Sequence, residues 1–225
     1  MAVWQELRIA LAGLIEERPG AVTLYPDLDG DGGPPPYQVG LAPWAEVPAR
    51  GLHERFGDLV GLMVGALPYP PGSTPRWPPP WPAEGPAGEP AALLDPAQAD
   101  AELDGPAVIS SGHTLRHGLL LRNYTSAELM IVTNGQVTAV VVDPRSGKVV
   151  GGYSGFQNRP LITFRVSPGG TERIPLLIGT ASFTERLGYA VPPGSWAIQA
   201  TLEIAGHREE RIRRRTPALP LTVTG

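Results

Sequence analysis

Prolines concentrate in residues 68–106, and this feature constrains the fold more than any other. Twelve of the chain's 27 prolines lie in this stretch, which includes the run RWPPPWP at 76–82. Proline fixes φ and has no backbone N–H, so the stretch favours polyproline II and interrupts helices and central strands. The sequence therefore predicts two folded parts, residues 1–67 and 107–225, joined by a proline-rich linker over 68–106.

The N-terminal part mixes helical and strand patterns. Apolar residues recur at helical spacing from Trp4 to Ile15, and Pro19-Gly20 then stops the pattern. The predicted segments are a helix over 2–18, strands over 21–26 and 37–42, a helix over 45–56 and a buried strand over 58–67. This order predicts a small α+β unit. A unit of this size is near the lower limit for independent stability, so we expect it to lean on the second part.

The C-terminal part carries strand patterns throughout. Its short apolar runs, separated by turn signals, cover 115–123, 128–133, 136–143, 148–153, 161–166, 171–178, 195–204 and 218–224. Asn134-Gly135 lies between two of them and predicts a hairpin, because both residues tolerate positive φ. The pattern predicts an all-β immunoglobulin-like antiparallel sandwich, with a small barrel as the alternative.

Four segments of this part follow a recognisable order of strands and turns. They are LLLRNYTSAELMI, AVVVDPRSGKVV, FRVSPGGTERIPL and VPPGSWAIQATLEI. In this order they resemble the bacterial intracellular proteinase inhibitor family over roughly 115–204, although Gly151-Gly152 stands where that family has an aromatic residue. The resemblance implies an immunoglobulin-like fold and inhibition of a protease through an exposed loop, here 149–160. The whole chain also resembles uncharacterised proteins of GC-rich bacteria that carry the segment LAPW…LHERFGD…VGALPYP.

Three aspartates, Asp27, Asp29 and Asp31, alternate along the chain and are followed by a glycine. They match the first six positions of an EF-hand calcium loop, D-x-D-x-D-G. The twelfth position is Gln38 instead of a bidentate glutamate, and prolines at 34–36 oppose the helix that should carry it. Two interpretations stay open: a calcium site completed by ligands from elsewhere and, preferred, an acidic turn between neighbouring strands.

Other catalytic and cofactor patterns are missing from the sequence. There is no cysteine, no Walker loop and no G-x-G-x-x-G. His113 and His117 form an H-x3-H pair, but extended backbone separates them by roughly 13 Å, too far for one metal ion. GGYSGF at 151–156 lacks the final glycine of a nucleophile elbow. We therefore predict a non-enzymatic protein without catalytic residues, with an active site between the two parts as the alternative.

Charge divides the chain. Residues 1–106 carry 5 basic and 15 acidic side chains, whereas 107–225 carry 13 and 7, so the two balances are −10 and +6. Such complementarity favours docking of the two halves on each other or an anionic partner. The basic run REERIRRR at 208–215 has no interleaved aromatic residue, so a nucleic acid is not expected, and an anionic ligand is the alternative.

The expected location is the cytoplasm. No apolar run approaches the eighteen or so residues of a membrane span, so no membrane contact is expected. Glu6 and Arg8 interrupt the first apolar residues too early for a signal-peptide core.

A protein partner is the expectation that the predicted sandwich favours, because sandwiches present edge strands and end loops. The candidate contacts are Tyr153 and Phe156 in the loop 149–160, and Trp77 and Trp81 in the proline-rich run. The two tryptophans have a second interpretation, in which they pack the linker against a domain. The alternatives to a protein-binding or accessory module are a proteinase inhibitor and a calcium-stabilised structural module.

Overall fold

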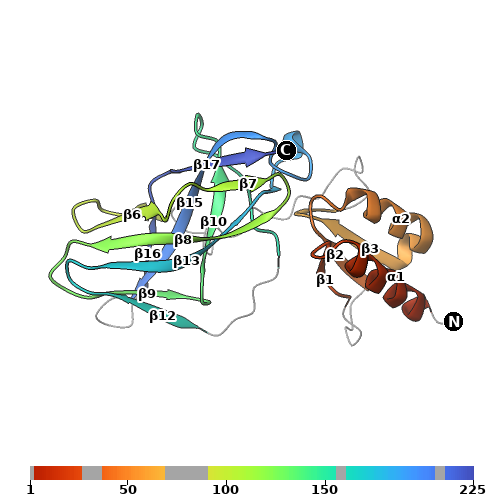
Figure 1. The fold of residues 1–225 in the computed structure, drawn as a ribbon, viewed down its shortest axis with the longest axis horizontal. Helices are drawn as coiled ribbons and strands as arrows, with labels where there is room; N and C mark the ends of the chain where they lie inside the picture. The colour runs from red at the N-terminus through yellow and green to blue at the C-terminus, as the bar shows by residue number, and fades with distance from the viewer. Residues whose placement is uncertain (1–2, 27–36, 69–90, 156–160, 206–210) are drawn as a thin grey trace.

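The structure is a computed structural model that describes residues 3–26, 37–68, 91–155, 161–205 and 211–225. These residues form an N-terminal α+β unit and a larger immunoglobulin-like β-sandwich, which lie next to each other (Figure 1). Both parts of the predicted fold class are therefore confirmed. No helix in the described part of the chain is both long and apolar enough to cross a membrane.

Two helices and a four-stranded sheet make up the N-terminal unit. Its elements are α1 (Val3–Glu17), β1 (Val22–Leu24), β2 (Tyr37–Leu41), α2 (Glu46–Phe56), η1 (Gly57–Leu59), β3 (Val60–Val64) and β4 (Leu67–Pro68). The strand order is β1-β2-β3-β4. Strands β2 and β3 are parallel because α2 forms the crossover between them. The predicted order of helices and strands is confirmed as far as β3, but residues 58–67 are not one strand, because the chain turns after β3 and pairs back as β4.

One face of this sheet is covered by the helices. Leu7, Leu11 and Leu14 of α1 are buried at helical spacing. They share a core with Val39 and Leu41 of β2. Because successive side chains of a strand point to opposite faces, the residue between these two, at position 40, belongs to the face turned away from the helices.

The sandwich contains more strands than the sequence patterns predict. Its elements are β5 (Ala92–Leu93), β6 (Ala99–Leu103), β7 (Val108–Ser110), β8 (Thr114–Asn123), β9 (Leu129–Thr133), β10 (Val137–Val142), β11 (Val149–Gly152), β12 (Ile162–Val166), β13 (Thr171–Gly179), β14 (Ala181–Ser182), η2 (Glu185–Leu187), β15 (Gly194–Ala205), β16 (Arg211–Arg215) and β17 (Leu219–Thr224). Every predicted run forms a strand. Most pairs are antiparallel, as predicted, but β10–β13, β16–β5 and β17–β7 are parallel.

Strand β15 is shared by the two sheets of the sandwich. Its first half pairs with β10 and β17, and its second half pairs with β9 and β16. Both β9 and β10 run antiparallel to β15, so they run in the same direction and the hairpin predicted at Asn134-Gly135 is wrong. The six residues 133–138 lie opposite only two residues of β15, 201 and 202, and the surplus loops out. The positive φ of 86° at Gly135 serves this bulge instead of a hairpin turn.

The predicted boundary at residue 107 is also corrected by the strand pairing. Strand β6 pairs with β8 along its whole length, and β5 pairs with the end of β16, so 92–106 belongs to the sandwich. Ala99 and Ala101 are buried in the sandwich core, alternating with the exposed Asp100. Alanine and acidic residues are poor strand formers, which is why the pattern did not stand out beside the prolines.

Asn123 ties three strands together at one corner of the sandwich. Its side chain is fully buried, and the amide donates hydrogen bonds to the carbonyl oxygens of Ala127 (2.7 Å), Val166 (3.0 Å) and Ser167 (3.3 Å). Its carbonyl oxygen accepts from the backbone N–H and the hydroxyl of Thr125. The end of β8 is thereby fixed to the start of β9 and the end of β12.

A groove between the two units as the candidate functional site

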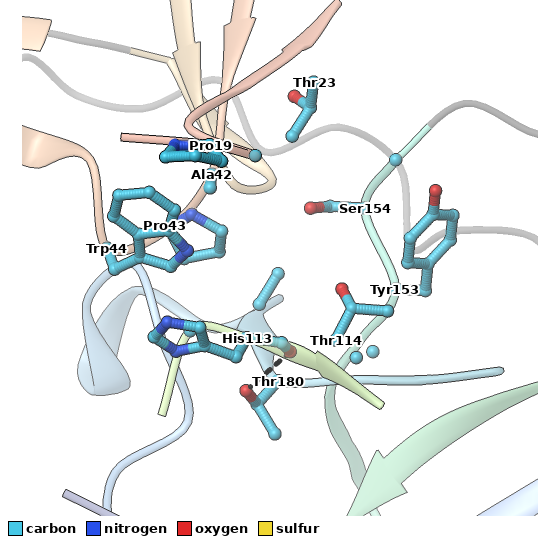
Figure 2. Close-up of a pocket in the computed structure, with 16 residues that line it drawn as sticks. Pro19, Thr23, Ala42, Pro43, Trp44, His113, Thr114, Tyr153, Ser154 and Thr180 are labelled. Atoms are coloured by element: carbon cyan, nitrogen blue, oxygen red, sulfur yellow. Dashed lines mark hydrogen bonds between the residues drawn. The ribbon is translucent and has the colours of Figure 1, made fainter. Parts of the chain in front are cut away.

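A cleft of about 220 Å³ lies where the N-terminal unit meets the sandwich (Figure 2). The N-terminal unit contributes Pro19, Gly20, Thr23, Ala42, Pro43 and Trp44, and the sandwich contributes Gly112, His113, Thr114, Gly152, Tyr153, Ser154, Gly155, Gly179, Thr180 and Ala181. Five separate stretches of the sequence thus meet at one site.

A second hollow of about 210 Å³ extends this cleft. It shares Thr23, Ser154 and Gly155 with the first and adds Leu24, Gly40, Met63 and Gly65. Leu24, Gly40 and Met63 are register neighbours across β1, β2 and β3. They lie on the sheet face turned away from the helices, so this face forms one wall and residues 154–155 form the other. We call the two hollows together the inter-unit groove.

Close contacts hold the two units against each other beside the groove. The Trp44 and His113 rings stack with centroids 5.5 Å apart and planes 10° from parallel. Gly112 has a positive φ of 77°, and a Cβ there would lie 3.2 Å from the backbone N of Trp44. Tyr189 of the sandwich packs against the core of the N-terminal unit. The expectation that the small unit leans on the second part is therefore met by direct packing.

Glycines bring the segment after β11 close to the end of β13. A Cβ on Gly179 would lie 2.5 Å from the Cα of Tyr153, so only glycine permits this approach. The segment leaves β11 here and runs along the groove. Figure 2 shows the Ser154 side chain pointing toward the Trp44 side, while the Tyr153 ring lies on the opposite side of the segment.

The polar groups of the described groove lining are hydroxyls, backbone groups, the imidazole of His113 and the indole N–H of Trp44. The buried Thr180 hydroxyl lies within hydrogen-bond distance of the carbonyl oxygens of Ser110 (3.0 Å) and His113 (3.1 Å), and this contact fixes the loop that carries the imidazole. Nδ1 of His113 lies 2.9 Å from the carbonyl oxygen of Ser111. Because a carbonyl only accepts, Nδ1 carries the hydrogen in this bond. The described lining therefore offers hydrogen-bonding groups and ring surfaces, and no carboxylate, lysine or arginine side chain.

Tyr153 is the one predicted site residue that lines the groove, although its ring lies on the side of the segment away from Trp44 (Figure 2). The inhibitory loop implied over 149–160 is partly a strand, since Val149–Gly152 form β11 and pair with β10 and β14. The other candidate residues lie outside the described part of the chain: Asp27, Asp29 and Asp31 for calcium, and Phe156, Trp77 and Trp81 for a partner.

The two histidines of the H-x3-H pair have separate surroundings. His113 stacks on Trp44, whereas the His117 ring nitrogens lie 3.1 Å from the carbonyl oxygen of Gly118 and 3.4 Å from that of Pro106. The described part of the basic run, 211–215, forms β16 and pairs with β15 and β5.

Sequence reasoning missed Trp44 and the role of His113 in the groove. The only signal for Trp44 was an aromatic residue just after a predicted strand, in the segment LAPW. Nothing local connects it with His113, because 68 intervening residues separate the two positions. Their stacking follows from how the units dock.

Comparisons with known proteins add a fold likeness only. No protein-family model and no curated protein matches the chain. The chain is similar to the CARDB domain of a Pyrococcus furiosus protein in complex with di-metal ions (11% identity, 56% of this chain and 88% of that one covered, TM-score 0.29). It is also similar to a PapD-like domain of human CEP192 (16% identity, 62% and 98% covered, TM-score 0.29) and to the CooA pilin subunit of enterotoxigenic Escherichia coli (10% identity, 57% and 99% covered, TM-score 0.28). The assignment of the sandwich rests on the strand pairing of this chain itself.

Proposed function

We propose that the protein is a non-enzymatic binding module that takes an extended segment of a partner protein into the inter-unit groove. The observation that carries the proposal is the continuity of the two hollows through Thr23, Ser154 and Gly155. The hollows hold about 220 and 210 Å³, and together they fall within the range of roughly 300–1,000 Å³ that is usual for ligand pockets.

The chemistry of the groove matches a polypeptide. A peptide backbone offers alternating N–H and C=O groups, which pair with hydroxyls and with backbone groups such as those of the segment 153–155. Leu24 and Met63 supply apolar surface for a partner side chain at one end, and the Trp44 ring supplies a flat surface at the other. Leu24 is 45% exposed, so its side chain is open to a ligand.

The support for binding without chemical conversion is also in the lining. His113 and Tyr153 are the titratable side chains among the described lining residues. The imidazole of His113 is held by stacking on Trp44 and by its bond to the Ser111 carbonyl, which suits a positioning contact.

The test is a selection of peptides from a display library, followed by titration of the selected peptides by calorimetry. Ser154→Trp places a large ring in both hollows, and Arg145→Trp places the same ring on an exposed turn as the matched control. The selected peptides are expected to bind the unmodified protein and the control equally, and the groove variant at least about tenfold more weakly, since about 1.4 kcal/mol corresponds to a factor of ten. Equal affinity for all three proteins, with circular dichroism showing each one folded, refutes the proposal.

A further inference from the structure

A separate cavity of about 410 Å³ lies on the sandwich, where β9 passes into β10. It exists because the residues 133–138 exceed the two residues of β15 that they face and loop away from the strand. Its described lining shares no residue with the inter-unit groove.

The walls of this cavity come from neighbouring strands. Gln199, Thr201 and Glu203 alternate along β15 and therefore point to the same face. Arg213 stands opposite Glu203 in the β15–β16 register, and Arg211 lies two residues earlier on the same strand face. The cavity thus combines amide, hydroxyl, guanidinium and carboxylate groups, with two positive side chains against one negative.

The guanidinium of Arg213 has an unused donor. Its Nε is buried and is the only buried side-chain nitrogen or oxygen within the described ranges that has no hydrogen-bond partner. Oε1 of Glu203 is 3.8 Å away, beyond hydrogen-bond distance. Arg211, in contrast, is paired with Glu203, because its Nη1 donates a hydrogen bond to Oε2 of that carboxylate at 3.3 Å. A buried donor without an acceptor is costly. The Nε atom is closed to solvent, whereas the Arg213 side chain as a whole is 35% exposed and lines the cavity, so a ligand oxygen meets the outer part of the guanidinium.

We propose that this cavity binds a small oxyanion, the phosphate or carboxylate group of a hydroxylated small molecule. Arg213 donates to the anionic oxygens in a charge-assisted hydrogen bond, and Arg211 adds positive charge. Gln199 and Thr201 offer neutral donors and acceptors to the hydroxyl groups of the same molecule. Glu203 competes with the ligand for both arginines, so it tunes the affinity.

The experiment titrates the full chain with inorganic phosphate, glucose 6-phosphate, gluconate and glucose by calorimetry, with sodium chloride at matched ionic strength as the blank. The three anions, or at least one of them, are expected to bind, and glucose is not. Tighter binding of glucose 6-phosphate or gluconate than of phosphate assigns the site to a hydroxylated molecule, and equal binding assigns it to the free oxyanion. Heat no larger than the chloride blank for every anion overturns the proposal.

Three variants locate the site. Arg213→Met is expected to weaken anion binding at least about tenfold, because one charge-assisted hydrogen bond is lost. Glu203→Gln is expected to strengthen it, since the competing carboxylate is removed. The control is Arg165→Met. It removes an exposed arginine of β12 that pairs with Glu128 outside the cavity, and this variant is expected to bind anions as the unmodified protein does.

Arg213→Lys covers the case in which the methionine variant fails to fold. It keeps the charge but lacks the planar fork of donors, so weaker binding is again expected. Binding that is unchanged in a folded Arg213 variant, or that falls equally in Arg165→Met, places the anion elsewhere and refutes the assignment. Loss of peptide binding in the groove variant leaves this result unaffected, because the two sites share no described residue.

Discussion

Replacing Asn123 with alanine tests the corner that joins β8, β9 and β12. The side chain is fully buried: its two amide hydrogens serve three carbonyl oxygens, and its oxygen accepts from the N–H and hydroxyl of Thr125. Alanine removes all of these hydrogen bonds and leaves their partners in place.

The size of the effect depends on which partners water can reach afterwards. The bond to Val166 is buried, whereas those to Ala127, Ser167 and Thr125 are only partly buried. A buried polar group that loses its hydrogen-bond partner lowers the free energy of unfolding by about 1–3 kcal/mol. A lost bond whose remaining partner becomes hydrated lowers it by about 1 kcal/mol or less. The free energy of unfolding is therefore expected to fall by about 3 kcal/mol. For a chain of this length that lowers the melting temperature by roughly 6–12 °C.

Urea unfolding followed by circular dichroism, together with a thermal melt, measures this loss. Asn134→Ala is the matched control, because Asn134 is exposed and its replacement is expected to change stability by no more than about 0.5 kcal/mol. A loss below about 1 kcal/mol for Asn123→Ala refutes the reasoning, since it means that the corner is not held by this side chain.

Three further predictions concern the docking of the units, one exposed turn and the acidic stretch. Gly112→Ala is expected to destabilise the protein by about 1–2 kcal/mol more than the control Gly188→Ala. Both glycines have a positive φ, but only at Gly112 would an added Cβ meet the backbone N of Trp44, at 3.2 Å. Equal losses in denaturant unfolding contradict tight docking. The backbone N–H of Arg145 donates to the Asp143 carboxylate at 2.8 Å and lowers the pKa of that carboxyl below its ordinary value of 3.8. The ionised carboxylate therefore stabilises the fold at pH values above 3.8, and this contribution is lost as the pH falls through the lower pKa of the folded state. An NMR titration of the Asp143 carboxyl measures the pKa, and a value at or above 3.8 refutes this. The turn interpretation of 27–31 predicts equal melting temperatures in chelator and in millimolar calcium; a rise with calcium that disappears in Asp29→Ala instead supports a calcium-stabilised module.

Local patterns predicted most of the regular structure. The leucine spacing of α1, the crossover helix α2 and all eight apolar runs of the sandwich appear where the sequence placed them. Such patterns succeed because one face of each element must be buried, and burial imposes a period of about 3.6 residues on a helix and of two on a strand. Strands without that contrast, such as β6 with its alanines and acids, escaped notice.

The candidate site was much less accessible from the sequence. Tyr153 was selected for the aromatic and glycine content of its loop, and the structure places it in the inter-unit groove. Trp44 and His113 gave no joint signal, since they lie far apart in the sequence and their contact depends on the docking of two units. The calcium hypothesis at Asp29 and the partner hypothesis at Trp77 stay predictions, because both residues lie outside the described ranges.

The sequence by itself determined the class of each half and most of the elements within it, because these depend on side-chain periodicity and on proline and glycine at fixed positions. The tertiary structure alone decided the direction of β10 after Asn134-Gly135, the membership of 92–106 in the sandwich, and the meeting of five stretches in the groove. Each of these outcomes depends on pairing between residues far apart in the chain. The energy of such pairing comes from the partner strand or the docked unit, so no local pattern records it.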